Sequence, residues 1–365
     1  MHRSPVRRTV AVASAPATPA GTFTGAVDPL DWCRMDMIIP IRPRPVSPRA
    51  RATARMPRTR DWSLGAAIGI AVLTVLMPVV ALAQQKPTRH VVTADDGQAL
   101  TVWEKRAASP RRTIVLLHGR TWSALPDFDL QVPGHPVSLM DALVEHGYAV
   151  YALDARGYGD TPRDASGWHT PDRAASDAIT VCRWVAAHSG VRGTPALFGW
   201  SYGSVIAQLS AQRAPDAVSA LVLFGHFAFA PSMPPDTASG PPPRKATTAE
   251  AAGEDFISPN ATDPAVKEAY VRAALAAQPI KADFRHVDQF NALDPAAVHV
   301  PTLEIMGEQD PVSNKSPGGE AEFFGKLGTP DREFVVLPGV DHAAFLENQR
   351  ARFVEALTDF LERPR

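Results

Sequence analysis

The chain has 365 residues and a formal net charge of −1, but the charge is unevenly distributed. Residues 1–61 contain eleven arginines against four aspartates, a net charge of +7, so the remainder is acidic at −8. An acidic body excludes a general nucleic-acid binder, because such proteins carry a basic surface. Of the two cysteines, Cys33 and Cys182, only Cys182 lies in the acidic part, which excludes an internal disulfide there. No cysteine or histidine cluster has metal-ligand spacing, so no metal is expected.

The first 83 residues predict export. Residues 64–83 carry no charge, arginines precede them, and Ala81, Leu82 and Ala83 form a small-x-small ending. Basic, apolar and cleavage regions in this order are typical of a secretory signal, here 56–83, which Met56 would begin at an ordinary length. We expect cleavage after Ala83 and a periplasmic or secreted product that meets the membrane only transiently. An uncleaved anchor is the alternative, because about twenty apolar residues can span a bilayer. Residues 1–55 show no sustained periodicity and are expected to be disordered or to lie upstream of the true start.

Beyond residue 84, short apolar runs alternate with segments of helical period. The predicted strands are 89–93, 99–105, 113–117, 148–153, 195–198, 220–224, 301–306 and 333–337. The predicted helices are 137–146, 171–188, 204–213, 264–277, 282–291, 320–327 and 343–363. This alternation predicts one α/β domain over 84–365, with a mostly parallel sheet covered on both faces. It breaks at about 226–297, a proline-dense insertion that we expect to cap the carboxyl edge of the strands.

The most informative motif is G-W-S-Y-G, which runs from Gly199 to Gly203. A short apolar strand precedes it and an amphipathic helix follows it. This arrangement is typical of a nucleophile elbow, a sharp turn that exposes a serine at the edge of the sheet. The two glycines are needed because strand and helix come so close that a β-carbon would clash. Ser201 is therefore the candidate nucleophile.

A serine hydroxyl needs a base to remove its proton and a third group to orient that base. His342 follows the predicted strand 333–337, and Asp310 follows the predicted strand 301–306. The chain order Ser201, Asp310, His342 is that of one hydrolase fold. Glu308 and Asp341 compete with Asp310 for the role of the acid, but Asp341 adjoins His342 and its side chain is expected to point away.

With these motifs the chain resembles the α/β-hydrolase superfamily from about residue 89 onward. The matching segments are His118-Gly119, Asp154-x-Arg156-Gly157-x-Gly159, the elbow, Gly307-x-x-Asp310 and Gly339-x-x-His342. The resemblance implies the α/β-hydrolase fold with a helical cap, and an oxyanion hole made by the backbone N–H groups of Tyr202 and Arg120. It also implies that His118, Asp154 and Arg156 hold loops together and take no part in the chemistry.

We therefore expect an exported, carboxylesterase-like serine hydrolase that cleaves a small-molecule ester through an acyl-enzyme on Ser201, without a cofactor. An amidase or proline-type aminopeptidase is the alternative, because relatives with that activity bind a free amine through cap carboxylates, and Glu250, Glu254 and Asp255 lie in this cap. A non-catalytic binding protein of the same fold is the alternative from a different class. The oligomeric state stays open. The predicted pocket-lining residues are Trp122, Phe128, Trp200, Tyr202, His226 and Phe227.

Overall fold

The computed structural model describes residues 85–227, 232–313 and 319–364. The predicted signal at 56–83 and the extension before it lie outside these residues. Within the described ranges, no helix combines the length and the apolar character that crossing a bilayer requires.

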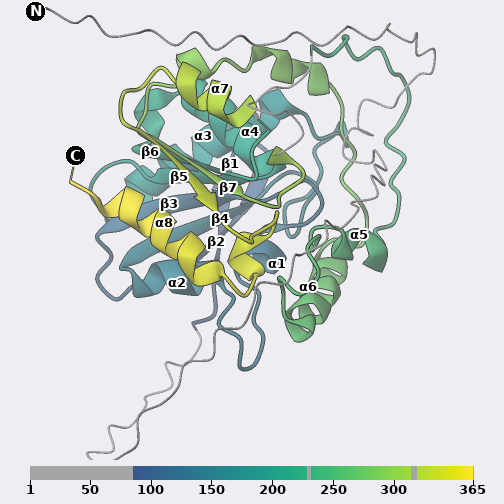
Figure 1. The fold of residues 1–365 in the computed structure, drawn as a ribbon. Helices are drawn as coiled ribbons and strands as arrows, with labels where there is room; N and C mark the ends of the chain where they lie inside the picture. Colours follow the sequence, from purple (N-terminus) through teal and green to yellow (C-terminus); the bar gives the residue numbers. More distant parts are fainter. Residues whose placement is uncertain (1–84, 228–231, 314–318, 365) are drawn as a thin grey trace, which may run out of the picture. The chain divides into compact units, whose positions relative to one another are not determined.

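Eight strands form one sheet in the order β1-β2-β4-β3-β5-β6-β7-β8 (Figure 1). The strands β1, β2 and β4 pair antiparallel, and every other neighbouring pair is parallel. The central strands are buried along their whole length, because helices cover both faces of the sheet. The strand bounds are β1 Thr88–Thr93, β2 Ala99–Arg106, β3 Arg112–Leu117, β4 Tyr148–Asp154, β5 Ala196–Trp200, β6 Ala220–Phe224, β7 Thr302–Gly307 and β8 Arg332–Leu337.

Two hydrophobic cores lie on opposite faces of this sheet. Helices α1, α2 and α8 supply side chains to one core, and α3, α4 and α7 supply the other. Figure 1 shows α3, α4 and α7 above the strands and α2 and α8 below them. The doubly covered, mostly parallel sheet is therefore confirmed. The helix bounds are α1 Ala124–Phe128, α2 Leu139–Glu145, α3 Pro171–His188, α4 Tyr202–Arg213, α5 Ala249–Gly253, α6 Pro264–Ala277, α7 Gly319–Lys326 and α8 Arg350–Glu362.

The chain between β6 and β7 contains the helical insertion. Helices α5 and α6 lie there, followed by the 3₁₀ turns η3 Val287–Ala292 and η4 Pro295–Ala297. The hydroxyl of Tyr270 on α6 donates to the buried carboxylate of Asp127 on α1 at 2.8 Å. The described part of the insertion is thereby tied to the body by a buried polar contact. The helix predicted at 282–291 is the 3₁₀ turn η3.

The prediction of one continuous final helix over 343–363 was wrong. A 3₁₀ turn, η6 Ala344–Leu346, ends first, and α8 begins only at Arg350. The carboxylate of Glu347 turns back to accept from the backbone N–H of Asp341 at 3.3 Å. The N–H of Asn348 donates to the carbonyl of Ala261 in the insertion at 2.8 Å. These tertiary hydrogen bonds replace the helical ones at the break.

Candidate active site

Ser201 occupies a strained turn between β5 and α4. Its backbone angles are φ 54° and ψ −121°, a region that serine rarely adopts. Its N–H donates to the carbonyl of Phe224 at the end of β6 (2.9 Å), and its own carbonyl accepts from Ser204 N–H (2.9 Å). The turn therefore holds Ser201 at the carboxyl edge of the sheet, where it is half-buried.

The two elbow glycines lie where the sequence requires them. A Cβ added at Gly199 would lie 2.2 Å from the carbonyl oxygen of Gly203. A Cβ at Gly203 would lie 2.3 Å from the carbonyl oxygen of Leu117. Both contacts are with backbone, which cannot move aside, so the predicted close approach of strand and helix is confirmed.

His342 and Asp310 form a buried pair at the ends of β8 and β7. The imidazole Nδ1 and the carboxylate Oδ2 lie 3.0 Å apart. Burial alone would lower the pKa of His342, but the charge and hydrogen bond of Asp310 outweigh it and raise that pKa. Burial would likewise raise the pKa of Asp310, but the charge of His342 and its hydrogen bond lower it. The pair therefore favours a proton on Nδ1.

The imidazole of His342 lies against the same strand end that holds Ser201. A Cβ added at Gly225 would lie 2.7 Å from His342 Cε1, so the ring rests on the residue that follows Phe224. The indole Nε1 of Trp200 donates to the carbonyl of His342 at 2.7 Å. Residues at the carboxyl ends of β5 and β6 thus contact both the predicted nucleophile and the predicted base.

The competing carboxylates bond elsewhere. The side chain of Asp341 accepts from the N–H groups of Ser258 (2.5 Å) and Ala343 (3.2 Å). Glu308 accepts from Gly339 N–H at 2.9 Å. Asp310 is the carboxylate that meets the imidazole nitrogen, and this geometry favours the predicted acid.

The cap also reaches the loops that carry acid and base. Ser258 donates its N–H to Asp341, next to His342, and its Oγ to Gln309 Oε1 at 2.8 Å, next to Asp310. A single residue of the insertion is thus bonded beside both predicted catalytic side chains.

Both predicted oxyanion donors lie beside the elbow. Tyr202 is the first residue of α4, and N–H groups in a first helical turn have no partner within the helix. A Cβ added at Gly119 would lie 3.6 Å from Ser201 Cβ, so the segment leading to Arg120 passes next to the nucleophile. This placement suits two N–H groups that converge on one oxygen.

His118 holds this segment in place, as expected. Its Nδ1 donates to the carbonyl of Gly119 (2.7 Å), and its Nε2 accepts from Ala155 N–H (3.1 Å). Burial lowers the pKa of His118 to about 4, so the ring is neutral. The hydroxyl of Tyr158 donates to the carbonyl of Arg120. These contacts make His118 a structural residue.

Asp154 and Arg156 also tie loops together. Asp154 accepts from Trp103 Nε1 at 2.8 Å and from Ala124 N–H at 2.9 Å. The guanidinium of Arg156 is 3 % exposed and pairs with Asp177 at 2.7 Å. Neither side chain has contacts suited to chemistry on a substrate.

A small cavity of about 20 Å³ borders the elbow helix. Its lining is mostly apolar. Of the predicted pocket residues, Tyr202 lines it. Trp122, Phe128, Trp200 and His226 are buried elsewhere, each at most 1 % exposed. The lining residues are Leu117, His118, Leu153, Ala155, Tyr158, His169, Ala174, Tyr202, Gly203 and Ile206.

Sequence reasoning missed two residues of this region. Gly225 leaves the space that the imidazole of His342 occupies. Ser313 Oγ lies 3.1 Å from Asp310 Oδ2 and 3.1 Å from the carbonyl oxygen of His226. The glycine directly after a predicted strand was a signal for the first, whereas nothing local marks the second.

Comparison with known proteins gives a consistent result. Residues 108–349 match the family model described as serine aminopeptidase, S33. Human protein ABHD12B is 33 % identical over 100 residues, which is 27 % of this chain and only 24 % of that protein. An esterase from Thermogutta terrifontis shares the fold at 21 % identity and a TM-score of 0.53, over 75 % of this chain and 98 % of the esterase.

An epoxide hydrolase from Vigna radiata also shares the fold, at 17 % identity and a TM-score of 0.52, over 77 % of this chain and 99 % of that one. Identities this low establish the fold alone. The family model, in contrast, spans more than half of the chain. The protein therefore belongs to the serine aminopeptidase S33 family of the α/β-hydrolase superfamily.

Proposed function

We propose that this protein is a serine hydrolase that cleaves carboxylic esters through an acyl-enzyme on Ser201. The observation that carries the proposal is the buried pair of His342 and Asp310, 3.0 Å apart, at strand ends beside a serine with φ 54°. A strained, half-exposed serine next to an oriented imidazole is the arrangement that nucleophilic acyl transfer requires.

The chemistry follows from which nitrogen carries the proton. Asp310 holds the proton of His342 on Nδ1, so Nε2 is left as the acceptor for the Ser201 hydroxyl proton. The Ser201 oxygen attacks the ester carbonyl carbon, and His342 then gives that proton to the leaving alcohol. Water repeats the sequence on the acyl-enzyme and releases the acid, while His342 takes and returns one proton.

Charge develops on the carbonyl oxygen during both attacks. The N–H groups of Tyr202 and Arg120 are the proposed donors to that oxygen. Removing such a donor typically costs about 3 kcal/mol in the activation barrier. Because both donors are backbone groups, positioned by α4 and by the His118 contacts, they need no rearrangement when the charge forms.

A covalent probe tests the nucleophile. A fluorophosphonate should label the wild type and lose labelling in Ser201→Ala. Ser210→Ala is the matched control, since Ser210 lies on the same helix but its hydroxyl bonds to the carbonyl of Ile206. Wild type that resists labelling would favour the non-catalytic binding protein.

An aminopeptidase is the second candidate, and one cap residue favours it. Asp255 is half-buried, and after Asp310 its charge also contributes to raising the pKa of His342. Such a carboxylate could pair with a substrate amine. The positive charge of Arg120 also interacts with Asp255. Asp255 therefore does not require a substrate amine to balance its charge, which favours an ester substrate.

The two candidates separate on a substrate panel. p-Nitrophenyl esters of increasing chain length should be turned over, and aminoacyl anilides should not. If anilides are the better substrates and Asp255→Asn raises KM for them but not for neutral esters, the aminopeptidase is the function and the esterase proposal is wrong.

Export is proposed from the sequence at 56–83. Cell fractionation of the full-length protein should find a shortened form outside the cytoplasm. A full-length cytoplasmic protein would contradict export and leave the hydrolase proposal unaffected.

A further inference from the structure

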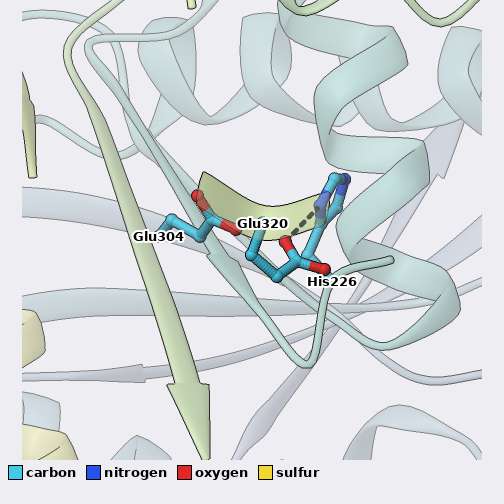
Figure 2. A group of neighbouring side chains, drawn as sticks. All are labelled: His226, Glu304 and Glu320. Atoms are coloured by element: carbon cyan, nitrogen blue, oxygen red, sulfur yellow. Dashed lines mark ion pairs between the residues drawn. The ribbon is translucent and has the colours of Figure 1, made fainter. Parts of the chain in front are cut away.

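A buried polar cluster lies away from the predicted catalytic side chains. His226 follows β6, Glu304 lies in the middle of β7, and Glu320 lies in the first turn of α7. Figure 2 shows the three side chains pointing toward one another. They are 1 %, 1 % and 7 % exposed, and one nitrogen or oxygen from each lies within 4.8 Å of the others.

Two members of this cluster have buried polar atoms without a hydrogen-bond partner among the described residues. They are both carboxylate oxygens of Glu304 and Nδ1 of His226. That nitrogen lies 3.7 Å from Glu320 Oε2, within ion-pair range but beyond hydrogen-bond distance. A buried carboxylate without a hydrogen bond is strongly unfavourable, so Glu304 calls for a proton or a cation.

A chain of amides determines which nitrogen of His226 carries the proton. Gln212 Oε1 accepts from the backbone N–H of Asp294 at 3.2 Å, which fixes the orientation of that amide. Gln208 Nε2 donates to the same oxygen at 3.0 Å, so Gln208 Oε1 is left facing His226 Nε2, also at 3.0 Å. An amide oxygen only accepts, and His226 Nε2 is therefore the donor.

With the proton on Nε2, Nδ1 offers a lone pair toward the carboxylates. An imidazole that donates one N–H to a fixed oxygen and presents its other nitrogen to acidic side chains has the arrangement of a metal ligand. A divalent cation bound between these side chains would compensate the charge of the buried Glu304 carboxylate.

We propose that His226 Nδ1 and the carboxylates of Glu304 and Glu320 bind one divalent cation of the zinc class. Mixed nitrogen and oxygen donors suit zinc, whereas magnesium and calcium prefer oxygen alone. Tetrahedral zinc places its ligand atoms roughly 3.4 Å apart, so small rotations of the two glutamates close the site.

The bound cation would hold the loop that carries Asp310 in position. Ser313 connects the carbonyl of His226 to Asp310 Oδ2, with 3.1 Å to each. Fixing His226 therefore supports the loop that carries the predicted acid. The site itself does not depend on any reaction at Ser201, so the proposal stands apart from the proposed function.

Zinc uptake by tag-free, full-length protein tests the proposal. After treatment with EDTA and dialysis against ZnCl₂, the wild type should hold one zinc per chain by elemental analysis. Glu304→Gln keeps the side-chain volume and removes the charge. Calorimetric titration should find its zinc affinity lower by about 100-fold or more, since even an outer partner of a ligand contributes 10- to 100-fold.

Glu322→Gln is the matched control. Glu322 lies on the same helix, α7, but is 58 % exposed and pairs with Lys326. Its zinc affinity should equal that of the wild type. Zinc in hundredfold excess over Kd should raise the Tm of the wild type and the control by roughly 5 °C and leave Glu304→Gln unchanged.

Three results would overturn the proposal. In the first, the wild type takes up no more zinc than Glu304→Gln, and the two carboxyls instead share a proton. In the second, Mg²⁺ or Ca²⁺ binds more tightly than Zn²⁺. The third is wild-type zinc affinity in Glu320→Gln, the variant that replaces Glu304→Gln where the latter does not fold.

Discussion

The space that Gly225 leaves for the imidazole allows a direct test of the active-site geometry. In Gly225→Ala the new methyl would lie 2.7 Å from His342 Cε1, whereas ordinary contacts begin at 3.4 Å. The ring must therefore move by at least about 0.7 Å. Misplacement of a reacting group by about 1 Å costs roughly 100-fold in rate. We expect kcat/KM for a p-nitrophenyl ester to fall about 100-fold, or about 2.7 kcal/mol in the barrier.

Gly190→Ala separates this effect from backbone strain. Gly225 has φ +58° and Gly190 has φ +71°, so alanine is strained at both positions, by about 1–2 kcal/mol. A Cβ at Gly190 meets nothing within 4 Å. Both variants should lose several degrees of Tm, and only Gly225→Ala should lose activity. Equal kcat/KM in the two folded variants would refute the placement of His342 in the reaction.

Three further predictions concern charge. Asp310→Asn should lower kcat/KM by about 10⁴-fold, because the base loses its orientation. Asp310 raises the pKa of His342, so the wild type loses its neutral base as pH falls below that raised pKa. Without Asp310 the pKa is lower, and the residual activity of the variant should persist to lower pH. An acid limb of the pH–activity profile that does not move would contradict this. Lys105→Ala should lower the free energy of unfolding by about 3–5 kcal/mol in urea denaturation, because buried Asp129 loses its ion-pair partner. The exposed control Lys326→Ala should cost under about 1 kcal/mol. Burial lowers the pKa of His169 to about 4. The free energy of unfolding should therefore fall by up to roughly 3 kcal/mol between pH 6.5 and pH 4, because the unfolded chain binds the proton first. His169→Gln should lose less stability over the same pH range.

The sheet could be predicted closely because its strands are short apolar runs between turn residues. Helices with strong starts were also placed well. Pro171 begins α3, and Asp263 caps α6 by accepting from Ala265 N–H at 2.8 Å. Helix α1 was missed because five residues are too few to show a period, and the Asp154 side chain holds its first N–H.

In the candidate site, too, some residues could be predicted from the sequence and others could not. Ser201, Asp310 and His342 could be predicted to lie near one another because each follows a strand of a parallel sheet, and such ends share one edge. Glu304 could not be found this way. Its neighbours His226 and Glu320 belong to other elements, so no spacing in the sequence relates the three residues of the proposed cation site.

Ser258 has a consequence for engineering. Chimeras that exchange the insertion between relatives treat it as an independent module. Here that exchange would also remove the hydrogen bonds to Asp341 and Gln309, the immediate neighbours of His342 and Asp310. The bond to Asp341 comes from the backbone N–H of Ser258, which any residue except proline can supply, whereas the bond to Gln309 needs the hydroxyl. A transplanted insertion therefore needs a serine at the equivalent place to keep both supports of the loops that carry the predicted acid and base.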